Sequence, residues 1–187
     1  MSVILLSNFV SESERASLLA WCDTNEECLG NARTADGESY LLRKISNSNA
    51  VVEAGGFPEV AYQVHGRIRE RFPMLGGSLQ RFLDGMTVGV LLPGGEFPEH
   101  VDHHFRQDGL VCVGVNALLS APASGGVVSV DGVEREQQEG DALVYLLSEQ
   151  IHGVSQVVGN VKRVVWSWRF MVDLATWNAM LSTSSNS

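Results

Sequence analysis

The sequence predicts a mostly β fold in which two N-terminal helices precede a double-sheet jelly roll. Helix signals occur before residue 80, whereas from about Arg81 the chain breaks into short runs rich in β-branched residues. Turn-forming Gly, Asn and Asp residues separate these runs. The composition, with 44% hydrophobic and 19% charged residues, is that of an ordinary globular domain.

Two segments of the N-terminal part have helical patterns. Ser11 and Glu14 stand in the S-x-x-E spacing of a capping box. The helix that they open carries the apolar residues Leu18, Leu19 and Trp21. A second helix is predicted from Pro58 to about Arg71, with apolar residues at helical spacing: Val60, Val64 and Ile68. The polar segments 30–37 and 46–56 predict loops.

The strands are predicted from runs such as TVGVLL, LVCVGVNALL, DALVYLL and VVWSWRFMV. Turns are expected at Pro93–Gly95, Asp131-Gly132, Glu139–Asp141 and Gly159-Asn160. With about 11 residues for a strand and its turn, the segment holds about eight strands. We therefore expect one domain over 1–187, made of a helical lead-in (1–80), a β core (82–171) and a flexible tail (182–187).

Charge and composition exclude several classes. The chain carries 13 basic and 22 acidic residues, a net charge of −9, which opposes phosphate backbones. No apolar run approaches the ~20 residues that span a bilayer, and the first ten residues lack a basic start typical of a signal peptide. The three cysteines have no CxxC spacing and are expected to be buried and reduced. We expect a cytoplasmic protein without membrane contact or a nucleic-acid partner; its oligomeric state is left undetermined.

A candidate metal centre lies in the β region. His100 and Asp102 share a face if the segment is a strand, and His152 follows the strand DALVYLL, where a neighbouring strand brings it beside them. Two imidazoles and one carboxylate form the facial triad of non-haem Fe(II) oxygenases. Three alternatives stay open: a solvated H-x-D turn, replacement of one ligand by His103 or His104, or another metal such as zinc.

A cationic side chain is predicted to face the same cavity. The segment VSQVV-GN-VKRVVWSWRF has the form of a hairpin with a two-residue loop, in which Gln156 pairs with Arg163 and His152 with Ser167. His152, Arg163, Ser167 and Arg169 then share a face, and Lys162 points the other way. A buried arginine requires an anion, so Arg163 implies an acidic ligand, unless it forms an ion pair at the surface. Asn116 is expected to line the cavity or to face an edge.

Together these residues resemble a known family. His100-x-Asp102, the run EGDALVY at 139–145, His152-Gly-Val and Arg163 look like the double-stranded β-helix (cupin-like) core of the 2-oxoglutarate/Fe(II)-dependent oxygenases. The resemblance covers about residues 82–171, and LSNFVSESERASLL is similar to the family's helical lead-in.

The resemblance implies specific roles for these residues. It implies that His100, Asp102 and His152 hold Fe(II), and that 2-oxoglutarate, the co-substrate used with O2, chelates the iron and pairs with Arg163. Ser167 is expected to add a hydrogen bond to the co-substrate, and Arg169 to buttress Asp102.

Two branches of the family compete. HVD, DGLVCVGVNALL and SGG are similar to prolyl hydroxylases, whose collagen-type members use a lysine near this place, so Lys162 competes with Arg163 as anchor. The spacing of Arg163 and Arg169 is similar to AlkB-type nucleic-acid demethylases. However, the tyrosine-rich segment that those enzymes carry before HxD is replaced here by VLLPGG.

The resemblance thus implies an Fe(II)- and 2-oxoglutarate-dependent dioxygenase that hydroxylates a small molecule or a peptide or protein side chain. A carboxylate at Asp102 favours hydroxylation over halogenation. The alternatives are an AlkB-type demethylase and a non-catalytic cupin-like binding module. Substrate contacts are expected in the loops 30–56, 94–99 and 103–109.

Overall fold

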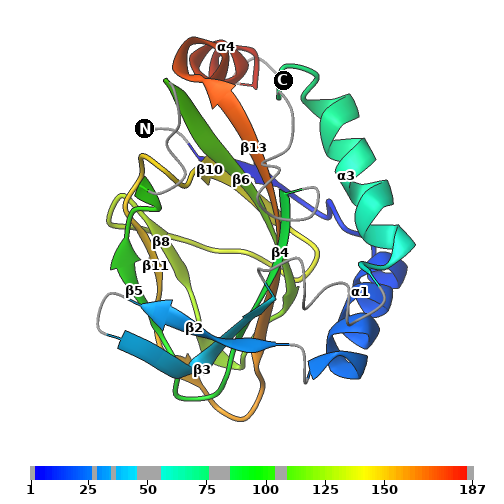
Figure 1. The fold of residues 1–187 in the computed structure, drawn as a ribbon, viewed down its shortest axis with the longest axis vertical. Coiled ribbons are helices and arrows are strands. Elements are labelled where there is room, and N and C mark those ends of the chain that lie inside the picture. Colours follow the sequence, from blue (N-terminus) through cyan, green and yellow to red (C-terminus); the bar gives the residue numbers. More distant parts are fainter. Residues whose placement is uncertain are drawn as a thin grey trace.

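Two antiparallel sheets face each other, and helices cover the outer face of the larger sheet (Figure 1). The computed structural model describes residues 3–26, 29–34, 37–45, 56–75, 85–103 and 109–184. Within this part of the chain, no helix is both long and apolar enough to cross a membrane. This architecture of facing sheets is the jelly roll that the sequence predicts.

The larger sheet has seven strands in the order β1-β10-β6-β13-β4-β3-β2. Their bounds are β1 Ile4–Leu6, β2 Gly30–Thr34, β3 Gly37–Ile45, β4 Met86–Leu91, β6 Leu110–Ser120, β10 Ala142–Leu146 and β13 Arg163–Asp173. The smaller sheet has the order β5-β11-β8-β9, with β5 Phe97–His100, β8 Val128–Val130, β9 Val133–Arg135 and β11 His152–Val154. A two-stranded sheet joins β7 Ser124–Gly125 to β12 Val157–Val158.

Both predicted N-terminal helices are confirmed as α1 (Glu12–Thr24) and α3 (Glu59–Arg71). The capping box is formed: the Ser11 side chain accepts a hydrogen bond from the Glu14 backbone, and the Glu14 carboxylate accepts one from the Ser11 backbone. Arg67 of α3 donates to the Glu14 carboxylate at 2.8 Å. Mainly because of this bond, the pKa of Glu14 falls to about 2, so the pair ties the two helices together through an ionised carboxylate.

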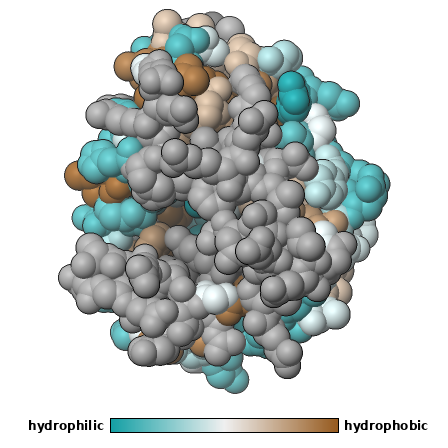
Figure 2. Space-filling model, viewed as in Figure 1, coloured by the Kyte–Doolittle hydropathy of each residue, from teal (hydrophilic) through white to brown (hydrophobic). Residues whose placement is uncertain are grey.

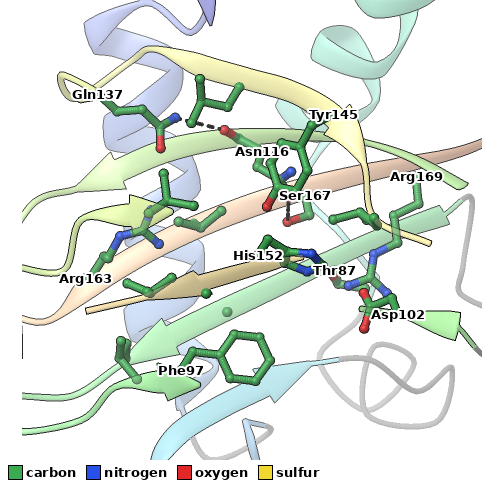
Figure 3. A pocket seen from close by; sticks show the side chains of 18 residues that line it. Thr87, Phe97, Asp102, Asn116, Gln137, Tyr145, His152, Arg163, Ser167 and Arg169 are labelled. Atoms are coloured by element: carbon green, nitrogen blue, oxygen red, sulfur yellow. Dashed lines mark hydrogen bonds between the residues drawn. The ribbon is translucent and has the colours of Figure 1, made fainter. Parts of the chain in front are cut away.

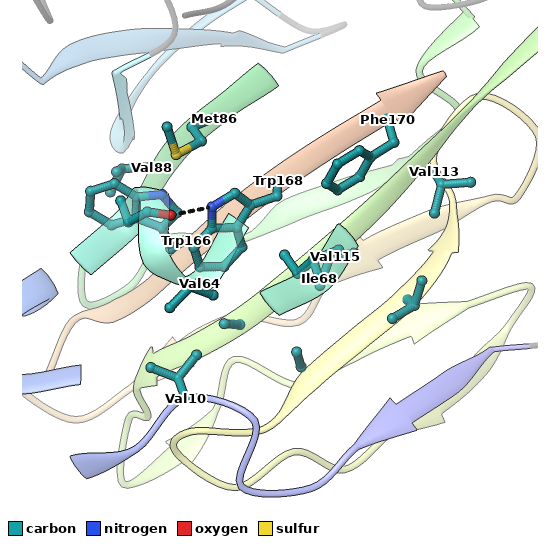
Figure 4. Packing of buried hydrophobic residues seen from close by; sticks show 14 of the residues in the cluster. Val10, Val64, Ile68, Met86, Val88, Val113, Val115, Trp166, Trp168 and Phe170 are labelled. Carbon is teal, nitrogen blue, oxygen red and sulfur yellow. Dashed lines mark hydrogen bonds between the residues drawn. The ribbon is translucent and has the colours of Figure 1, made fainter. Parts of the chain in front are cut away.

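The main core lies between these helices and the larger sheet. Alternate residues of β13 point into it, and Trp166, Trp168 and Phe170 are fully buried there (Figure 4). The Trp168 indole donates a hydrogen bond to the Ala61 carbonyl of α3 at 3.1 Å, so its polar atom is satisfied inside the core. The other face of β13 is thereby left for the space between the two sheets.

The solvent face of α3 is hydrophilic, as the right edge of Figure 2 shows. It carries basic and acidic residues together, among them the exposed Arg69 and Glu70. Arg67 of the same helix is bound to Glu14. The described part of α3 is therefore a mixed-charge surface and not a basic patch.

The structure differs from the sequence prediction in three segments: the helical lead-in, the predicted loop 30–37 and the predicted tail. The lead-in 1–80 is not wholly helical, because β1, β2 and β3 extend the larger sheet, and residues 30–37 belong mainly to β2 and β3. Their polar composition hides the strand pattern. The predicted tail from 182 begins inside α4 (Leu174–Ser184), which buries Trp177 and Met180. Residues 185–187 and the predicted loop 46–55 lie outside the described part.

The predicted hairpin around Gly159-Asn160 is wrong. β13 pairs with β4 and β6 of the larger sheet, whereas β11 pairs with β5 and β8 of the smaller one. Arg163 stands opposite Leu91, not Gln156, and Ser167 stands opposite Thr87 and Asn116, not His152. The chain crosses from one sheet to the other at this turn, so short-range hairpin rules do not apply to it.

Turn chemistry is predicted correctly at Asp131-Gly132. Val130 pairs with Val133 across this two-residue loop, and both loop residues have positive φ, 52° and 72°. Asp tolerates and Gly favours that conformation, as a tight hairpin turn requires. The β8–β9 hairpin is therefore encoded locally, in contrast to the crossing at residues 159–160.

The described cysteines are structural. Cys22 and Cys112 are free and buried, and burial raises the pKa of each thiol to about 12. Both therefore act as small apolar side chains at neutral pH, as the sequence predicts. Cys28 lies outside the described residues.

Candidate functional site

A cavity opens between the inner faces of the two sheets (Figure 3). Alternate residues of the long strands line it, because side chains two apart on a strand share a face. From the larger sheet these include Thr87, Asn116, Tyr145, Arg163, Ser167 and Arg169, and from the smaller sheet Phe97, Val128, His152 and Val154. Asp102 and Gln137 also reach the cavity. Six polar residues that the sequence singled out thus meet in one space: Asp102, Asn116, His152, Arg163, Ser167 and Arg169.

Two of these residues, Asp102 and His152, form a compact cluster with His100 of β5. The ligand atoms of His100, Asp102 and His152 all lie within 4.8 Å of one another, the one such group of three among the described residues. The two imidazole rings are 4.4 Å apart, and the His100 Nε2 lies 3.5 Å from the Asp102 carboxylate. His152 is buried and the other two are half-buried, so the group is shielded yet open to the cavity.

Backbone pairing positions the histidines. His152 of β11 stands directly opposite His100 of β5, as the sequence predicts for adjacent strands. Each Nδ1 lies 2.9 Å from a backbone carbonyl, that of Pro98 for His100 and that of Gln150 for His152. A carbonyl only accepts, so both Nδ1 atoms carry a proton, and in the neutral form of each ring the lone pair lies on Nε2. This is the tautomer that a metal ligand requires.

Asp102 reaches the cluster by a different route from the predicted one. β5 ends at His100, so Asp102 does not share a strand face with it. Its backbone N–H instead donates to the Leu147 carbonyl at 2.9 Å, which holds the segment against the end of β10. The H-x-D spacing correctly predicts that Asp102 lies near His100. The contact with Leu147, and not the alternation of side chains along a strand, brings the two together.

The Asp102 carboxylate is held in its ionised form. Burial by itself raises its pKa, but the hydrogen bond with His100 and the nearby charges, above all that of Arg169, outweigh burial and hold the pKa well below its usual range. Arg169 is itself buried on the cavity wall, and Figure 3 shows its side chain directed toward Asp102. The cluster therefore combines an ionised carboxylate with two imidazole rings.

Arg163 lies toward the opposite end of the cavity from Asp102 (Figure 3). It is only 8% exposed, and its Nε donates to the Gly126 carbonyl at 2.8 Å. No described carboxylate pairs with it, and burial lowers its pKa to about 10. A buried cation with terminal N–H groups free for another acceptor is a binding group for an anion.

Lys162, the competing anchor, lies elsewhere. Its ammonium donates to the Asp23 carboxylate at 2.7 Å, and that bond raises the lysine pKa. Lys162 does not line the cavity, whereas its neighbour Arg163 does. The predicted alternation along β13 is thus correct, although the hairpin register that supported it is not.

Asn116 and Ser167 form a polar pair on the cavity wall. The Ser167 hydroxyl donates to the Asn116 side-chain oxygen at 2.6 Å, and the two residues stand opposite each other on β6 and β13. The Asn116 Nδ2 is buried without a hydrogen-bond partner. Both residues line the cavity, so the edge-facing alternative for Asn116 is wrong.

His103, one of the two remaining histidine candidates, does not join the cluster. His103 is exposed and follows Asp102 in a short turn. His104, which the sequence keeps as an alternative ligand, lies outside the described residues, as do residues 105–108 of the predicted substrate loop.

Sequence reasoning missed four polar or aromatic wall residues: Thr87, Phe97, Gln137 and Tyr145. Tyr145 was within reach of prediction, because Leu143, Tyr145 and Leu147 alternate in DALVYLL and all three line the cavity. Its ring lies 5.4 Å from that of His152. Burial raises its pKa and outweighs the opposing charge of Arg163, so the hydroxyl stays protonated.

Comparison with known proteins rests on structure. No protein-family model matches the chain, and no curated protein matches it. Among solved structures, a viral collagen prolyl hydroxylase from Paramecium Bursaria Chlorella virus-1, in its 2OG complex, is 14% identical with a TM-score of 0.62, over 91% of this chain and 96% of its own. A Pseudomonas putida prolyl-4-hydroxylase is 19% identical with a TM-score of 0.59, over 91% and 92%.

A third structure extends the comparison beyond prolyl hydroxylases. The non-heme alpha ketoglutarate dependent epimerase SnoN from nogalamycin biosynthesis is 11% identical with a TM-score of 0.67, over 91% of this chain and 76% of its own. At these identities the likeness concerns the fold. The chain has the jelly-roll fold of 2-oxoglutarate-dependent oxygenases, which is the fold that the sequence resemblance predicts.

Proposed function

We propose that this protein is an Fe(II)- and 2-oxoglutarate-dependent dioxygenase that hydroxylates a small molecule or a peptide or protein side chain. The observation that carries the proposal is the content of one cavity. Toward one end Asp102 and His152 line it and cluster with His100, and toward the other end lies the buried Arg163, which pairs with no carboxylate of the described residues. The fold supports the same function, since it is shared with enzymes of this class.

The donor set fits Fe(II). Two neutral imidazoles and one ionised carboxylate, with coordination positions left open, are the ligands of non-haem Fe(II) oxygenases. The backbone carbonyls that accept from each Nδ1 orient the rings, and the hydrogen bond with His100 together with the Arg169 charge keeps Asp102 ionised. Bound iron and 2-oxoglutarate supply the oxidising power for hydroxylation when O2 is present. The protein's own part is to hold these groups and to exclude water.

Arg163 is the proposed anchor of the co-substrate. A guanidinium binds a carboxylate through two parallel N–H bonds, and in a buried site such bonds are strong because water does not compete for them. Tyr145, whose hydroxyl stays protonated because burial raises its pKa, lines the same cavity as Arg163 and Asp102. Ser167 and Asn116 add polar groups to the same wall.

Solved structures of the same fold indicate the substrate classes. One is a prolyl hydroxylase from Trichoplax adhaerens in complex with a peptide fragment, and others act in nogalamycin biosynthesis. A small molecule or a peptide therefore suits this chain. The net charge of −9 and the pairing of Arg67 with Glu14 disfavour the demethylase alternative, which needs a nucleic-acid surface.

The test is the conversion of 2-oxoglutarate to succinate by the Fe(II)-loaded protein, measured first without a primary substrate and then across peptide and small-molecule libraries. We expect slow uncoupled succinate release that a substrate accelerates. Binding of Fe(II) and 2-oxoglutarate without any succinate would support the non-catalytic binding module instead. A salt-dependent affinity for oligonucleotides would revive the demethylase.

A further inference from the structure

A second, outer cavity lies on the far side of Arg163. It is open and has a volume of about 670 Å³, within the range of small-molecule sites. It is surrounded by the segment 121–127, which includes β7, by the end of β9 and by the residues around Asn8. Val128, Gln137 and Arg163 line both this outer cavity and the inner one with the metal cluster. These three side chains are therefore the partition between the two spaces.

A second arginine faces the outer cavity. Arg135 of β9 stands directly opposite Val128 of β8, so the two side chains share a face of the sheet. Arg135 lines the outer cavity but not the inner one. Its Nε is buried and has no hydrogen-bond partner within the described part of the chain. Arg135 and Arg163 thus present two guanidinium groups to one space, and neither pairs with a carboxylate among the described residues.

The two acidic side chains that line the outer cavity, Glu136 and Asp141, form no ion pair with either arginine in the described part of the chain. Both oxygens of Asp141 accept backbone N–H bonds at 2.8 Å, from Asn8 and from Gln138. Glu136 lines the cavity but is exposed to solvent. Glu139 does not line it and is bound to Arg15. The Asp141 carboxylate is thus bound to backbone N–H groups and not to an arginine. The guanidinium groups of Arg135 and Arg163 therefore remain available for an anionic ligand.

We propose that the outer cavity binds a small polycarboxylate between Arg135 and Arg163, and that this ligand competes with 2-oxoglutarate for Arg163. The competition follows from the hydrogen bonds of the guanidinium. Since its Nε is taken by the Gly126 carbonyl, Arg163 keeps a single end-on pair of N–H groups for a bidentate carboxylate. That pair serves one cavity at a time. The competitive part of this inference rests on the proposed role of Arg163, whereas binding in the outer cavity does not.

Binding is tested by calorimetry on the metal-free protein, with tricarballylate as the probe. We expect binding to the unaltered protein, and an affinity at least tenfold weaker in Arg135→Gln. Arg69→Gln removes the same charge from an exposed position of α3 and should bind as the unaltered protein does. Ser124→Trp, a bulky change at the exposed rim of the outer cavity, should weaken binding as well and does not depend on the fold of the Arg135 variant.

The competitive part is tested in the succinate assay. Tricarballylate should raise the apparent KM for 2-oxoglutarate in the unaltered protein, and at least tenfold higher concentrations should be needed in Arg135→Gln. Without tricarballylate, that variant should keep the normal KM. Equal tricarballylate affinity in Arg135→Gln and the unaltered protein, or none in either, would overturn the outer site. If no succinate forms at all, the proposed function fails while calorimetry still decides on the outer cavity.

Discussion

Replacement of Arg163 by methionine should stabilise the ligand-free protein while it removes co-substrate binding. Arg163 is 8% exposed, and one hydrogen bond to a backbone carbonyl is all that offsets its loss of hydration. Methionine has a similar length, fills the same space and carries no charge. The buried charge of Arg163 lowers the free energy of unfolding of the ligand-free protein, as is common for binding residues, and the replacement removes that charge.

The expected change in the free energy of unfolding follows from the pKa of Arg163 and from its hydrogen bond to Gly126. Burial lowers the pKa of Arg163 to about 10, and each pKa unit is worth about 1.4 kcal/mol, so the charged form is destabilised by about 3 kcal/mol at neutral pH. Loss of the bond to Gly126 costs about 1 kcal/mol. The net gain of about 2 kcal/mol corresponds to an increase in Tm of about 4–8 °C for a chain of this size.

The assay is thermal unfolding with and without 2-oxoglutarate, the metal site being loaded with a redox-inert divalent ion. The unaltered protein should gain Tm on adding 2-oxoglutarate, and Arg163→Met should begin higher but gain little. Lys162→Met is the matched control, since it breaks a surface ion pair worth at most about 1 kcal/mol and should keep the ligand response. A lower Tm for Arg163→Met together with an unchanged response to 2-oxoglutarate would refute the reasoning.

Three further predictions concern the metal cluster and the helices. His152→Ala should abolish Fe(II) binding in calorimetry, whereas His103→Ala, at an exposed position, should leave it unchanged; equal loss in both would contradict the ligand set. Gly153→Ala should weaken metal binding, because a Cβ there would lie 2.9 Å from the Phe97 carbonyl and push β11 away from β5; Gly66→Ala in α3, with open space around it, is the control. Glu14→Gln should cost about 1 kcal/mol at neutral pH in chemical denaturation. Since the folded pKa is depressed to about 2, this contribution is present above about pH 4.5 and should vanish as the pH falls toward 2; a constant difference would contradict it.

Local patterns in the sequence determine much of the molecule. The capping box at Ser11, the helical spacing after Pro58 and the Asp131-Gly132 turn each depend on neighbours within a few residues, and all three form as predicted. The alternation along β13 correctly separates Trp166 and Trp168, which face the helices, from Arg163, which faces the cavity. These features are readable because backbone geometry relates residues close in the chain.

Contacts between distant segments are what tertiary structure decides. The hairpin prediction failed because the chain changes sheets after residue 158, a choice made by the pairing of β13 with β4 and β6. A hydrogen bond from the Asp102 backbone to the Leu147 carbonyl brings Asp102 into the cluster. An ion pair with Asp23 holds Lys162 away from the cavity. The outer cavity beside Arg135 likewise exists only once three separate segments meet. No spacing in the sequence encodes such contacts, because their energies come from burial and pairing between residues that the folded chain alone makes neighbours.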